Sequence, residues 1–552
     1  MNEILAALKK IVPLEKIDVE IPPDPQLGDY AFPCFPLSKL LKKNPQDIAQ
    51  ELSKKIELPS SVERVEAKGP YLNFFLKKTD LARNVIESIR KGNYGKDIQG
   101  KTVMVEFPSP NTNKPLHLGH LRNIFLGMEV CNILRFLGNN VIVSNLINDR
   151  GIHICKSMLA YKKWGMNKEP DKKSDHFVGD FYVLYSSKED NILKEEAQQM
   201  LLKWEQKDKE TRALWKKMNR WALTGFSQTF KKVGYTSDKT YYESMLYKKG
   251  KEIIKDGKAK GVFYKTEKGA IAISLQGLGE KIVLREDGTS VYITQDIYLA
   301  YKKFSDFNLN QSIHVVGSEQ EFHFKALIAT LKKLEFNHAS DVYHLSYGMV
   351  FLPEGKMKSR EGIVVDADNI IEEITSLALE EVKKRYPTLS DKEQRKRGEK
   401  IGLAALRFFL LKSDAKNSIH YDPKESLSFE GETGPYIQYT YARLSSILRK
   451  YGKTIPTDIN FSLLSSEEDK KILRILSDFP SIIKEAGEQF KIHLIARFLL
   501  ELAQACNEYY HKYPILKEEE QLRDARIILF YCAQSVLKIG LSLMNIDAIE
   551  KM

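Results

Sequence analysis

Two histidines that bracket a glycine mark the segment of this chain richest in possible chemistry. His117 and His120 flank Gly119 within the run Ser109-Pro-Asn-Thr-Asn-Lys-Pro-Leu-His-Leu-Gly-His-Leu-Arg-Asn123. Imidazole N–H groups can donate hydrogen bonds to phosphate oxygens as charge builds up during a displacement. A glycine between them lets a flat base lie against the backbone. This run, called the histidine motif below, therefore predicts a nucleotide site, although a histidine pair that only caps a helix is the simpler alternative.

The residues around the histidine motif predict the elements that position it. Lys101–Phe107 is rich in β-branched residues, which is typical of a strand. The i, i+3, i+4, i+7 spacing of an amphipathic helix is met by Leu121, Ile124, Phe125 and Met128. Gly138 ends that helix, and Val141–Ser144 forms the next strand. A strand–helix–strand unit predicts a parallel sheet, and the unpaired N–H groups at the helix start suit a phosphate.

The same alternation returns later in the chain after an interruption. The interruption, at about 156–280, carries lysine-rich amphipathic helices such as Lys203–Trp221, and a turn-rich, β-like stretch spans 261–293. Beyond it the sequence predicts a strand at 312–316, a helix at 323–334 and a strand at 342–351. From about 426 the patterning is almost wholly helical.

A second candidate for phosphate chemistry follows the last of these strands. The loop at 353–362, called the lysine loop below, contains Lys356-Met-Lys-Ser-Arg360. A lysine on a loop can neutralise charge on pyrophosphate as it leaves. A lysine-rich loop is also an ordinary solvated turn, so it gains weight only together with the histidine motif.

These two segments resemble the paired signatures of one enzyme class. The histidine motif resembles the "HIGH" region of class I aminoacyl-tRNA synthetases in the form found in arginyl-tRNA synthetases, and the lysine loop resembles the "KMSKS" loop. The resemblance covers nearly the whole chain. It implies an arginine–tRNA ligase, which uses ATP with Mg²⁺ to activate L-arginine to arginyl-adenylate. The arginyl group is then transferred to the 3′ end of tRNA-Arg, giving AMP and diphosphate.

The resemblance also implies roles for individual residues. The lysine loop departs from the class pattern, because Ser359 stands where the class has lysine and Lys358 stands one place earlier. Arginyl-tRNA synthetases often carry a lysine upstream of the histidines instead, here Lys114. The catalytic set implied is therefore His117, His120, Lys114 and Lys356. The ATP contacts add Gly119, Met357 and Ser359, and a protein-bound structural metal is not expected.

Selection of arginine requires a carboxylate for the guanidinium fork, because a wrong amino acid then leaves buried polar groups unpaired. The stretch Tyr292-Ile-Thr-Gln-Asp296 resembles the family element that provides it. The alternative is that Asp296 only favours the first turn of a helix behind Thr294. By the same resemblance, the arginine site comprises Ser109, Asn111, Tyr292, Asp296 and Gln320. The role of Asn148 and Asp149, in a family-like loop, stays open.

The two ends of the chain resemble the tRNA-binding parts of the family. Tyr436 and Tyr439, in the run 428–443, are suited to stacking on splayed anticodon bases, whereas tyrosines of this run can also form the edge of a helical core. Asp29 and Tyr30 lie in a segment that resembles the module that touches the tRNA elbow. All four are assigned to tRNA binding by resemblance.

The predicted fold class is α/β, with a Rossmann-like doubly wound parallel-sheet catalytic domain. The predicted domains are an N-terminal α+β module at 1–90, the catalytic domain at 91–425 with its insertion at about 156–280, and an all-α anticodon-binding bundle at 426–552. The net charge of +12 fits a polyanionic partner such as tRNA, although many basic proteins bind no nucleic acid.

Cellular location and assembly are inferred less directly. The five scattered cysteines indicate a reducing, cytoplasmic environment without disulfides. The sequence contains no apolar run of about 20 residues, so it predicts no membrane span. The N-terminus lacks the features of an export signal. A monomer is implied by the resemblance.

Three other functions are possible alternatives, and a feature of the sequence disfavours each of them. A cysteinyl enzyme of the same class would need zinc ligands that this sequence lacks. Small nucleotidyltransferases with H-x-G-H have no helical anticodon domain. A catalytically silent tRNA scaffold is disfavoured by Lys114, His117, His120 and Asp296.

Overall fold

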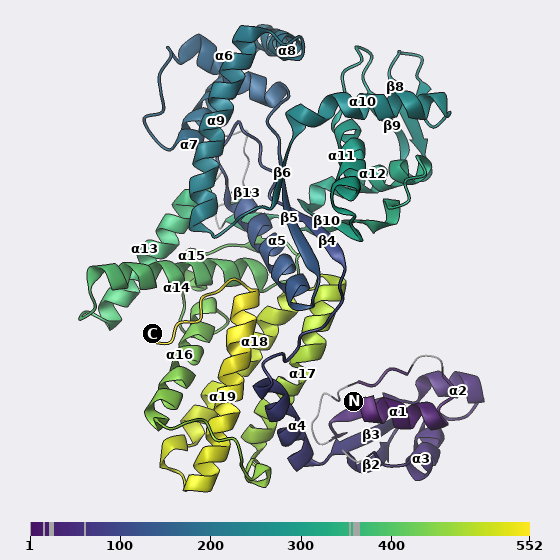
Figure 1. Cartoon of the computed structure of the whole chain (residues 1–552), viewed down its shortest axis with the longest axis vertical. Coiled ribbons are helices and arrows are strands. Elements are labelled where there is room, and N and C mark those ends of the chain that lie inside the picture. The colour runs from purple at the N-terminus through teal and green to yellow at the C-terminus, as the bar shows by residue number, and fades with distance from the viewer. Residues whose placement is uncertain are drawn as a thin grey trace. The chain divides into compact units, whose positions relative to one another are not determined.

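The computed structural model describes residues 2–14, 17–20, 22, 27–59, 62–352, 355–356 and 365–552. Figure 1 shows the helices and strands along the chain, which forms two compact units. The first contains Met1–Tyr94, Leu444–Asp478 and Gln504–Val536. The second contains Gly95–Arg443, Phe479–Ala503 and Leu537–Met552.

The second unit is built on a five-stranded parallel sheet with the order β11-β10-β4-β5-β6. Its strands are β4 (Thr102–Glu106), β5 (Asn140–Ile147), β6 (Lys239–Tyr242), β10 (Gln311–Gly317) and β11 (Val342–Tyr347). Successive residues of the central strands are buried, as a sheet covered on both faces requires. The Rossmann-like doubly wound fold predicted from the sequence is confirmed.

Helix α5 (Leu118–Phe136) connects β4 to β5 and is buried along most of its length. Gly127 explains how closely it packs, because a Cβ there would overlap the ring of Phe107. The opposite face of the sheet is covered by α11 (Tyr292–Phe307) and α12 (Glu321–Lys333). The apolar residues of these two helices form one core with those of β8 and β9.

The inserted segment differs from its prediction in two ways. It contains α6 (Ile152–Trp164), α7 (Ser174–Ser187), α8 (Asn191–Glu205), α9 (Lys209–Lys232) and α10 (Glu243–Ala259). The single helix expected at 203–221 is wrong, because the Asp208 side chain accepts the Thr211 N–H and starts a new helix there. The segment also supplies β6 to the main sheet.

The β-like stretch after α10 forms a small antiparallel sheet of β7 (Tyr264–Lys265), β8 (Ile271–Leu275) and β9 (Gly279–Leu284). The strand expected at 342–351 is instead two strands, since β11 ends at Tyr347 and β12 (Val350–Leu352) joins another sheet. At the break, Gly348 lies so close to Asn417 that a Cβ would meet its backbone at 2.6 Å.

The second small sheet has the order β13-β12-β14, with β13 at Gly355–Lys356 and β14 at Ile419–His420. Two antiparallel neighbours, α13 (Ala367–Arg385) and α14 (Asp391–Leu411), and the short α15 (Pro423–Ser426) lie between β13 and the C-terminal helices in sequence. Asp366 and Ser390 cap α13 and α14 with their side chains.

The N-terminal module in the first unit has its own apolar core. It contains α1 (Asn2–Ile11), β1 (Tyr30–Pro33), α2 (Phe35–Leu41), α3 (Pro45–Lys55), β2 (Val62–Lys68) and β3 (Tyr71–Leu76), and α4 (Lys78–Arg90) follows. The strands form an antiparallel sheet of order β1-β3-β2, as expected of an α+β module.

Four long helices end the chain, as predicted: α16 (Gly434–Tyr451), α17 (Glu467–Gln489), α18 (His493–Lys512) and α19 (Glu520–Leu543). Among the described residues only α19 is long and apolar enough to cross a membrane, and 67% of its most apolar stretch is buried, as in the core helix of a bundle. All five cysteines are buried and none forms a disulfide.

Candidate active site

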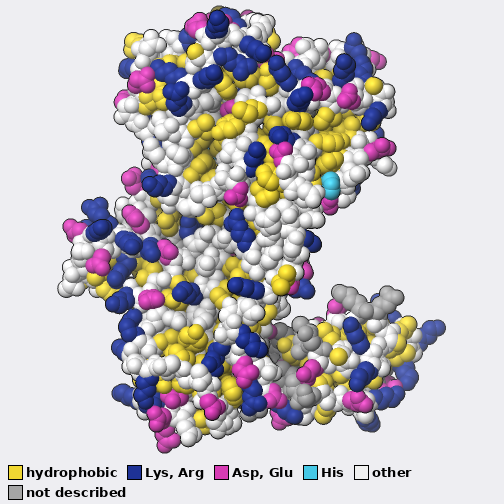
Figure 2. All heavy atoms as spheres, in the orientation of Figure 1, with side chains coloured by type: hydrophobic (Ala, Val, Ile, Leu, Met, Phe, Trp, Pro, Cys, Tyr) yellow, Lys and Arg dark blue, Asp and Glu magenta, His cyan; other side chains and the backbone are white. Residues whose placement is uncertain are grey.

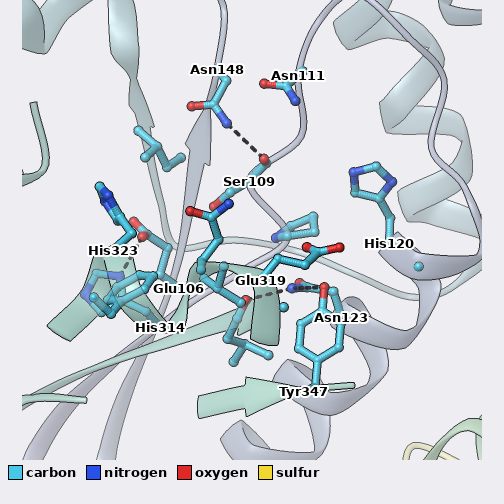
Figure 3. Close-up of a pocket in the computed structure, with 18 of the residues that line it drawn as sticks. Glu106, Ser109, Asn111, His120, Asn123, Asn148, His314, Glu319, His323 and Tyr347 are labelled. Carbon is cyan, nitrogen blue, oxygen red and sulfur yellow. Dashed lines mark hydrogen bonds and ion pairs between the residues drawn. The ribbon is translucent and has the colours of Figure 1, made fainter. Parts of the chain in front are cut away.

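A cavity of about 620 Å³ opens at the carboxyl ends of β4 and β10. This is the point where the strand order reverses, since β5 lies on one side of β4 and β10 on the other. Open α/β sheets bind ligands at such a reversal, because the loops from the two strands part there. Figure 3 shows side chains from β4, β10, the histidine motif and α12 converging on the cavity.

Most of the predicted site residues line this one cavity: Ser109, Asn111, Lys114, His117, Gly119, His120, Tyr292, Asp296 and Gln320. The structure therefore brings together the two groups that the sequence separated, the histidine motif and the Tyr292–Asp296 element. The side chain of Lys356 and the residues Met357, Lys358 and Ser359 lie outside the described part of the chain.

The two histidines form a compact pair at the start of α5. His117 is the N-cap residue, and its backbone N–H donates to Nδ1 of His120 at 3.2 Å. The ring centroids are 3.8 Å apart. A Cβ on Gly119 would lie 3.0 Å from Cε1 of His117, so a larger residue at 119 would press against this ring. The capping and phosphate-binding interpretations are thus compatible.

Burial and the nearby Lys114 ammonium lower the pKa of His117 to about 3. Burial, and then His117 and Lys114, hold the pKa of His120 well below its usual value. Burial likewise lowers the pKa of Lys114, against the opposing charge of Glu319. Both imidazoles are therefore neutral near pH 7, and each keeps one N–H to donate to an anionic ligand.

The loop before the helix is fixed by side-chain amides. The Asn145 side chain accepts the N–H of Ser109 at 3.2 Å, and the Asn148 side chain donates to the Ser109 carbonyl at 3.1 Å. Asn111 and Asn148 also form a parallel β-bridge. Asn148, whose role the sequence left open, thus joins the loop after β5 to the histidine motif.

Asp296 faces the cavity from α11 and is paired with a histidine. Its Oδ2 lies 2.7 Å from Nε2 of His323 on α12, and both side chains are 26% exposed. Burial would lower the pKa of His323, but the hydrogen bond and charge of Asp296 raise it above its usual value. His323 is a site residue that sequence reasoning missed, because the pairing needs both helices in place.

The alternative reading of Asp296 as a first-turn acid is wrong. Helix α11 begins at Tyr292, so Asp296 lies beyond the first turn, and Val291 is the N-cap residue. Thr294 does not cap the helix either, because its hydroxyl donates to the Val283 carbonyl. The helix dipole therefore does not account for an acid at this position.

A buried group of polar side chains, two of which line the cavity, was also missed. Lys303 Nζ lies 2.6 Å from Oε2 of Glu106, and Nδ1 of His314 lies 3.0 Å from Oε1. Burial would raise the pKa of Glu106, but Lys303 and His314 lower it to about 2. The ionised Glu106 thus joins β4, α11 and β10 at the wall of the cavity. A glutamate in an otherwise apolar strand was the available signal.

A second buried network, of hydrogen bonds and charged side chains, involves the loop after β5. Asp149 accepts the N–H and hydroxyl of Ser244 at 2.8 and 2.6 Å, which fixes the start of α10. Beside it, burial raises the pKa of Glu243 to about 8, with Arg150 opposing and Asp149 and Asp296 adding to the rise. The open role of Asp149 is therefore structural in this conformation.

Arg122, within the histidine motif, stabilises the part of the cavity wall formed by Gly348 and Met349. Its guanidinium is fully buried and donates to the carbonyls of Gly348, Met349, Ala415 and Asn417 at 2.6, 3.4, 3.1 and 2.8 Å. Next to it, Asn123 donates to the Val315 carbonyl at 2.7 Å and to the Tyr347 hydroxyl at 3.2 Å. These bonds fix the break between β11 and β12, where Gly348 and Met349 line the cavity.

Replacing Arg122 with methionine is expected to lower the free energy of unfolding by about 3 kcal/mol or more, because the buried carbonyls lose their donors. Chemical denaturation followed by circular dichroism measures this. Arg135→Met is the matched control on the same helix, since Arg135 is 46% exposed there, and a change within about 0.5 kcal/mol is expected. Equal effects of the two substitutions would contradict the structural role of Arg122.

None of the four residues assigned to tRNA lines this cavity. Tyr436 and Tyr439 are partly exposed on α16, whereas Tyr441 is 2% exposed and belongs to the core. The hydroxyl of Tyr439 accepts a hydrogen bond from Arg443 at 3.2 Å. In the N-terminal module the carboxylate of Asp29 pairs with Arg474 at 2.8 Å, and Tyr30 is half-buried. The tRNA contacts of these residues stay predictions.

Comparisons with known proteins agree with this arrangement. Three family models match the chain: the N-terminal domain of arginyl-tRNA synthetase at residues 1–76, the catalytic domain of class I (R) tRNA synthetases at 84–422, and the DALR anticodon-binding domain at 437–552. The arginine–tRNA ligase of Treponema denticola is 46% identical, over 98% of this chain and 96% of its own. That of Parabacteroides distasonis is 40% identical, over 95% and 94%.

Solved structures give the same result. The arginyl-tRNA synthetase of Thermus thermophilus superposes with a TM-score of 0.87 at 28% identity, covering 100% of this chain and 99% of its own. The Plasmodium falciparum enzyme shares the fold with a TM-score of 0.82 at 20% identity, covering 100% and 97%. With full-length relatives, matching catalytic and anticodon-binding regions and a histidine-lined cavity at the strand reversal, this chain belongs to the arginyl-tRNA synthetases, the class I ligases that use ATP to join arginine to tRNA.

Proposed function

We propose that the cavity at β4 and β10 binds arginine and ATP side by side and carries out both steps of arginylation. The observation that carries this proposal is the shared lining. Asp296, paired with His323, and the neutral histidine pair at the start of α5 open into the same cavity. An arginine held by its guanidinium at Asp296 can then direct its carboxylate toward a nucleotide held at the helix start.

The arginine end of the cavity has the polar groups that a guanidinium needs. We assign Asp296 as the carboxylate that pairs with it, and the large exposed ring of Tyr292 as a wall at the mouth. Ser109, Asn111 and Gln320 line the same cavity and can supply further oxygen acceptors. Since His323 engages Oδ2 of Asp296, we assign Oδ1 as the oxygen that meets the incoming guanidinium first.

The nucleotide end is assigned to the histidine motif. Backbone N–H groups at the start of α5 suit phosphate oxygens, and Gly119 lets the adenine lie close to the backbone. Lys114 and the neutral imidazoles of His117 and His120 supply positive charge and N–H donors. Lys356, with Met357 and Ser359, is assigned to the pyrophosphate by resemblance.

Magnesium is proposed to enter with ATP rather than to reside in the protein. Mg²⁺ bound to nucleotide takes most of its ligands from phosphate oxygens and water. Glu319, whose charge acts on Lys114, lines the cavity and fits as a carboxylate oxygen donor. Such an ion supplies charge neutralisation on the phosphates.

The chemistry needs positioning more than acid–base catalysis. An oxygen of the arginine carboxylate attacks the α-phosphorus of ATP, a new P–O bond forms, and pyrophosphate departs with the electron pair of the broken bond. A terminal ribose hydroxyl of the tRNA then attacks the carbonyl carbon of arginyl-adenylate and forms the ester. The bond from that carbon to the phosphate oxygen breaks, and AMP leaves with the electron pair while the hydroxyl proton passes to its phosphate or to water. Hydrogen bonds from His117, His120 and Lys114 stabilise the charge that develops on the phosphate oxygens.

The tRNA is proposed to contact both ends of the chain, with Tyr436 and Tyr439 at the anticodon and Asp29 and Tyr30 in the elbow-binding module. Figure 2 shows Lys and Arg side chains spread widely over the visible face, which suits a large polyanion better than one small ligand. We further propose a cytoplasmic monomer with the domains 1–90, 91–425 and 426–552.

The test of the proposed function is exchange of radiolabelled pyrophosphate into ATP. Exchange is expected only when arginine and tRNA-Arg are both present, followed by charging of the tRNA. Strong exchange without tRNA would contradict the tRNA dependence, and no charging of any arginine acceptor would contradict the function.

A further inference from the structure

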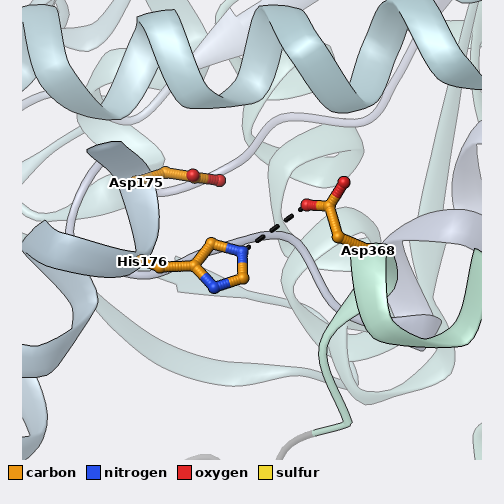
Figure 4. Close-up of side chains that lie close together, drawn as sticks. All are labelled: Asp175, His176 and Asp368. Carbon is orange, nitrogen blue, oxygen red and sulfur yellow. Dashed lines mark ion pairs between the residues drawn. The ribbon is translucent and has the colours of Figure 1, made fainter. Parts of the chain in front are cut away.

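Beyond the cavity, a cluster of charged side chains joins the first turn of α7 to the start of α13. Figure 4 shows Asp175 and His176 of α7 facing Asp368 of α13. Nε2 of His176 lies 3.2 Å from Oδ2 of Asp366 and 3.5 Å from Oδ2 of Asp368. Asp175 is fully buried and Asp368 is 9% exposed, so these charges are largely removed from water.

The cluster has ligand types that suit a metal ion, yet a lysine already lies at its centre. Nζ of Lys173 is 2.8 Å from Oδ2 of Asp175, 2.8 Å from Oδ2 of Asp368 and 2.8 Å from the hydroxyl of Thr229. Lys232 engages the other oxygen of Asp368 at 3.0 Å. The ammonium of Lys173 therefore serves as the central cation, with three oxygen acceptors for its three N–H bonds.

His176 is a further partner of these carboxylates. The carboxylate of Asp368, and then those of Asp366 and Asp175, raise the pKa of His176 above its usual value, against burial and Lys173. Burial would raise the pKa of Asp368, but His176, Lys173 and Lys232 hold it below its usual range. Lys173, Lys232 and His176 thus face three aspartates, and a buried ionic cluster needs such pairing of its charges.

The same helix also presses on the histidine motif. Gly179, one turn after His176, packs so closely that a Cβ would lie 2.6 Å from Cδ of Pro115 and 3.6 Å from Cα of Lys114. A larger side chain at 179 would therefore displace the backbone that carries Lys114. Helix α7 thus contacts the first of the two signature segments directly.

The residues held by the cluster are bonded to the histidine motif as well. The N–H of Leu118 donates to the Val365 carbonyl at 3.1 Å, and the N–H of Ala367 donates to the Leu116 carbonyl at 3.0 Å. His117 and Asp366 form the antiparallel bridge between these bonds. Residues 365–368 follow the lysine loop closely in the sequence, so the histidine motif is bonded to the segment that comes after that loop.

We propose that Lys173, supported by His176 and Thr229, is a positioning residue for the ATP half of the reaction. It fixes α7 against α13, and through Gly179 and the 365–368 segment it holds Lys114 and His117 in place. This inference rests on the assignment of Lys114 and His117 to ATP proposed above. It gives the insertion a role in adenylate formation.

The test compares Lys173→Met with Lys172→Met in tRNA-dependent pyrophosphate exchange by the full-length enzyme. Lys172 is the matched control, because it precedes the same helix and its ion pair with Asp180 is exposed. For Lys173→Met, a misplacement of about 1 Å is expected to lower kcat/KM for ATP by about 100-fold, with the KM for arginine within about twofold of the original. Lys172→Met is expected to match the unsubstituted enzyme.

Three further measurements separate positioning from folding. Lys173→Arg, which keeps a cation, is expected to recover part of kcat/KM for ATP. If Lys173→Met does not fold, Thr229→Val keeps the side-chain shape and removes one acceptor of Lys173, and it should also lower kcat/KM for ATP. Active-site titration excludes a simple loss of active molecules.

Two results would overturn the inference. One is a folded Lys173→Met enzyme whose kcat and KM for ATP are unchanged. The other is an enzyme whose KM for arginine rises by the same factor as its KM for ATP. Failure of the proposed function is distinct, because the unsubstituted enzyme itself would then show no arginine-dependent exchange.

Discussion

Replacing Asp296 with asparagine is expected to raise the KM for arginine by roughly 100-fold, corresponding to a loss of about 3 kcal/mol. Asparagine keeps the shape of the side chain but removes the charge, and its NH₂ group turns a donor toward a guanidinium that offers only donors. The preference for arginine over lysine is expected to fall with it, because both derive from the same carboxylate. The KM for ATP should change little, since the nucleotide is assigned to the histidine motif.

The matched control is Asp306→Asn on the same helix. Asp306 is also 26% exposed and also paired with a cation, Lys302 at 3.0 Å, but it does not line the cavity. Its substitution should leave the KM for arginine unchanged. Steady-state exchange kinetics with arginine and lysine as competing substrates measure both variants. If Asp296→Asn kept the arginine affinity and the preference over lysine, the assignment of the amino-acid site would be wrong.

The pairing with His323 gives this experiment a second readout. In the structure His323 lies 2.7 Å from one oxygen of Asp296, so an arriving guanidinium shares a carboxylate that is already oriented. We expect Asp296→Asn to return the pKa of His323 toward its ordinary value or below, because only burial and Lys281 would then act on it. A nuclear magnetic resonance titration of the His323 ring reports this shift independently of activity.

Replacing His120 with asparagine is expected to lower kcat of pyrophosphate exchange by about 100-fold to 1000-fold, the usual effect of removing one donor from a developing oxyanion. The side-chain oxygen of asparagine can still accept the His117 N–H that Nδ1 of His120 accepts, so the start of α5 is preserved. The substitution removes the Nε2–H group that is assigned to donate a hydrogen bond to the phosphates. The KM for arginine should stay near its original value.

His338→Asn is a suitable control for this substitution. Its Nδ1 pairs with Asp341 at 2.9 Å, and the residue is half-exposed and outside the cavity. Single-turnover measurements of adenylate formation, with unfolding temperatures recorded in parallel, distinguish chemistry from stability. An His120→Asn enzyme that formed adenylate at the original rate would remove the histidine pair from the mechanism.

Local patterns in the sequence were sufficient to predict the strand and helix that carry the site. The β-branched run at 101–107 and the apolar spacing from Leu121 predicted β4 and α5, because strand and helix formation depend on residues close together in the chain. The order of strands and helices then predicted the doubly wound sheet, since parallel crossovers of one hand permit few arrangements. The loop–helix position of the histidine motif also followed from the sequence.

Where the sequence-based prediction was wrong, a competing local or distant contact was responsible. The helix expected at 203–221 is divided because Asp208 caps a new helix, a signal present in the sequence but outweighed by the continuous amphipathic pattern. The strand expected at 342–351 is divided because Gly348 must pass close to Asn417. No window of sequence around 348 contains that neighbour.

By itself, the sequence determined the fold class, the family and the loop that carries the two histidines. Only the tertiary structure decided which side chains complete the site. The pairing of Asp296 with His323, the bonds from Arg122 to residues near 348 and 417, and the cluster around Lys173 all join separate elements. Such contacts depend on how helices and strands pack, and side-chain spacing along the chain does not encode that packing directly.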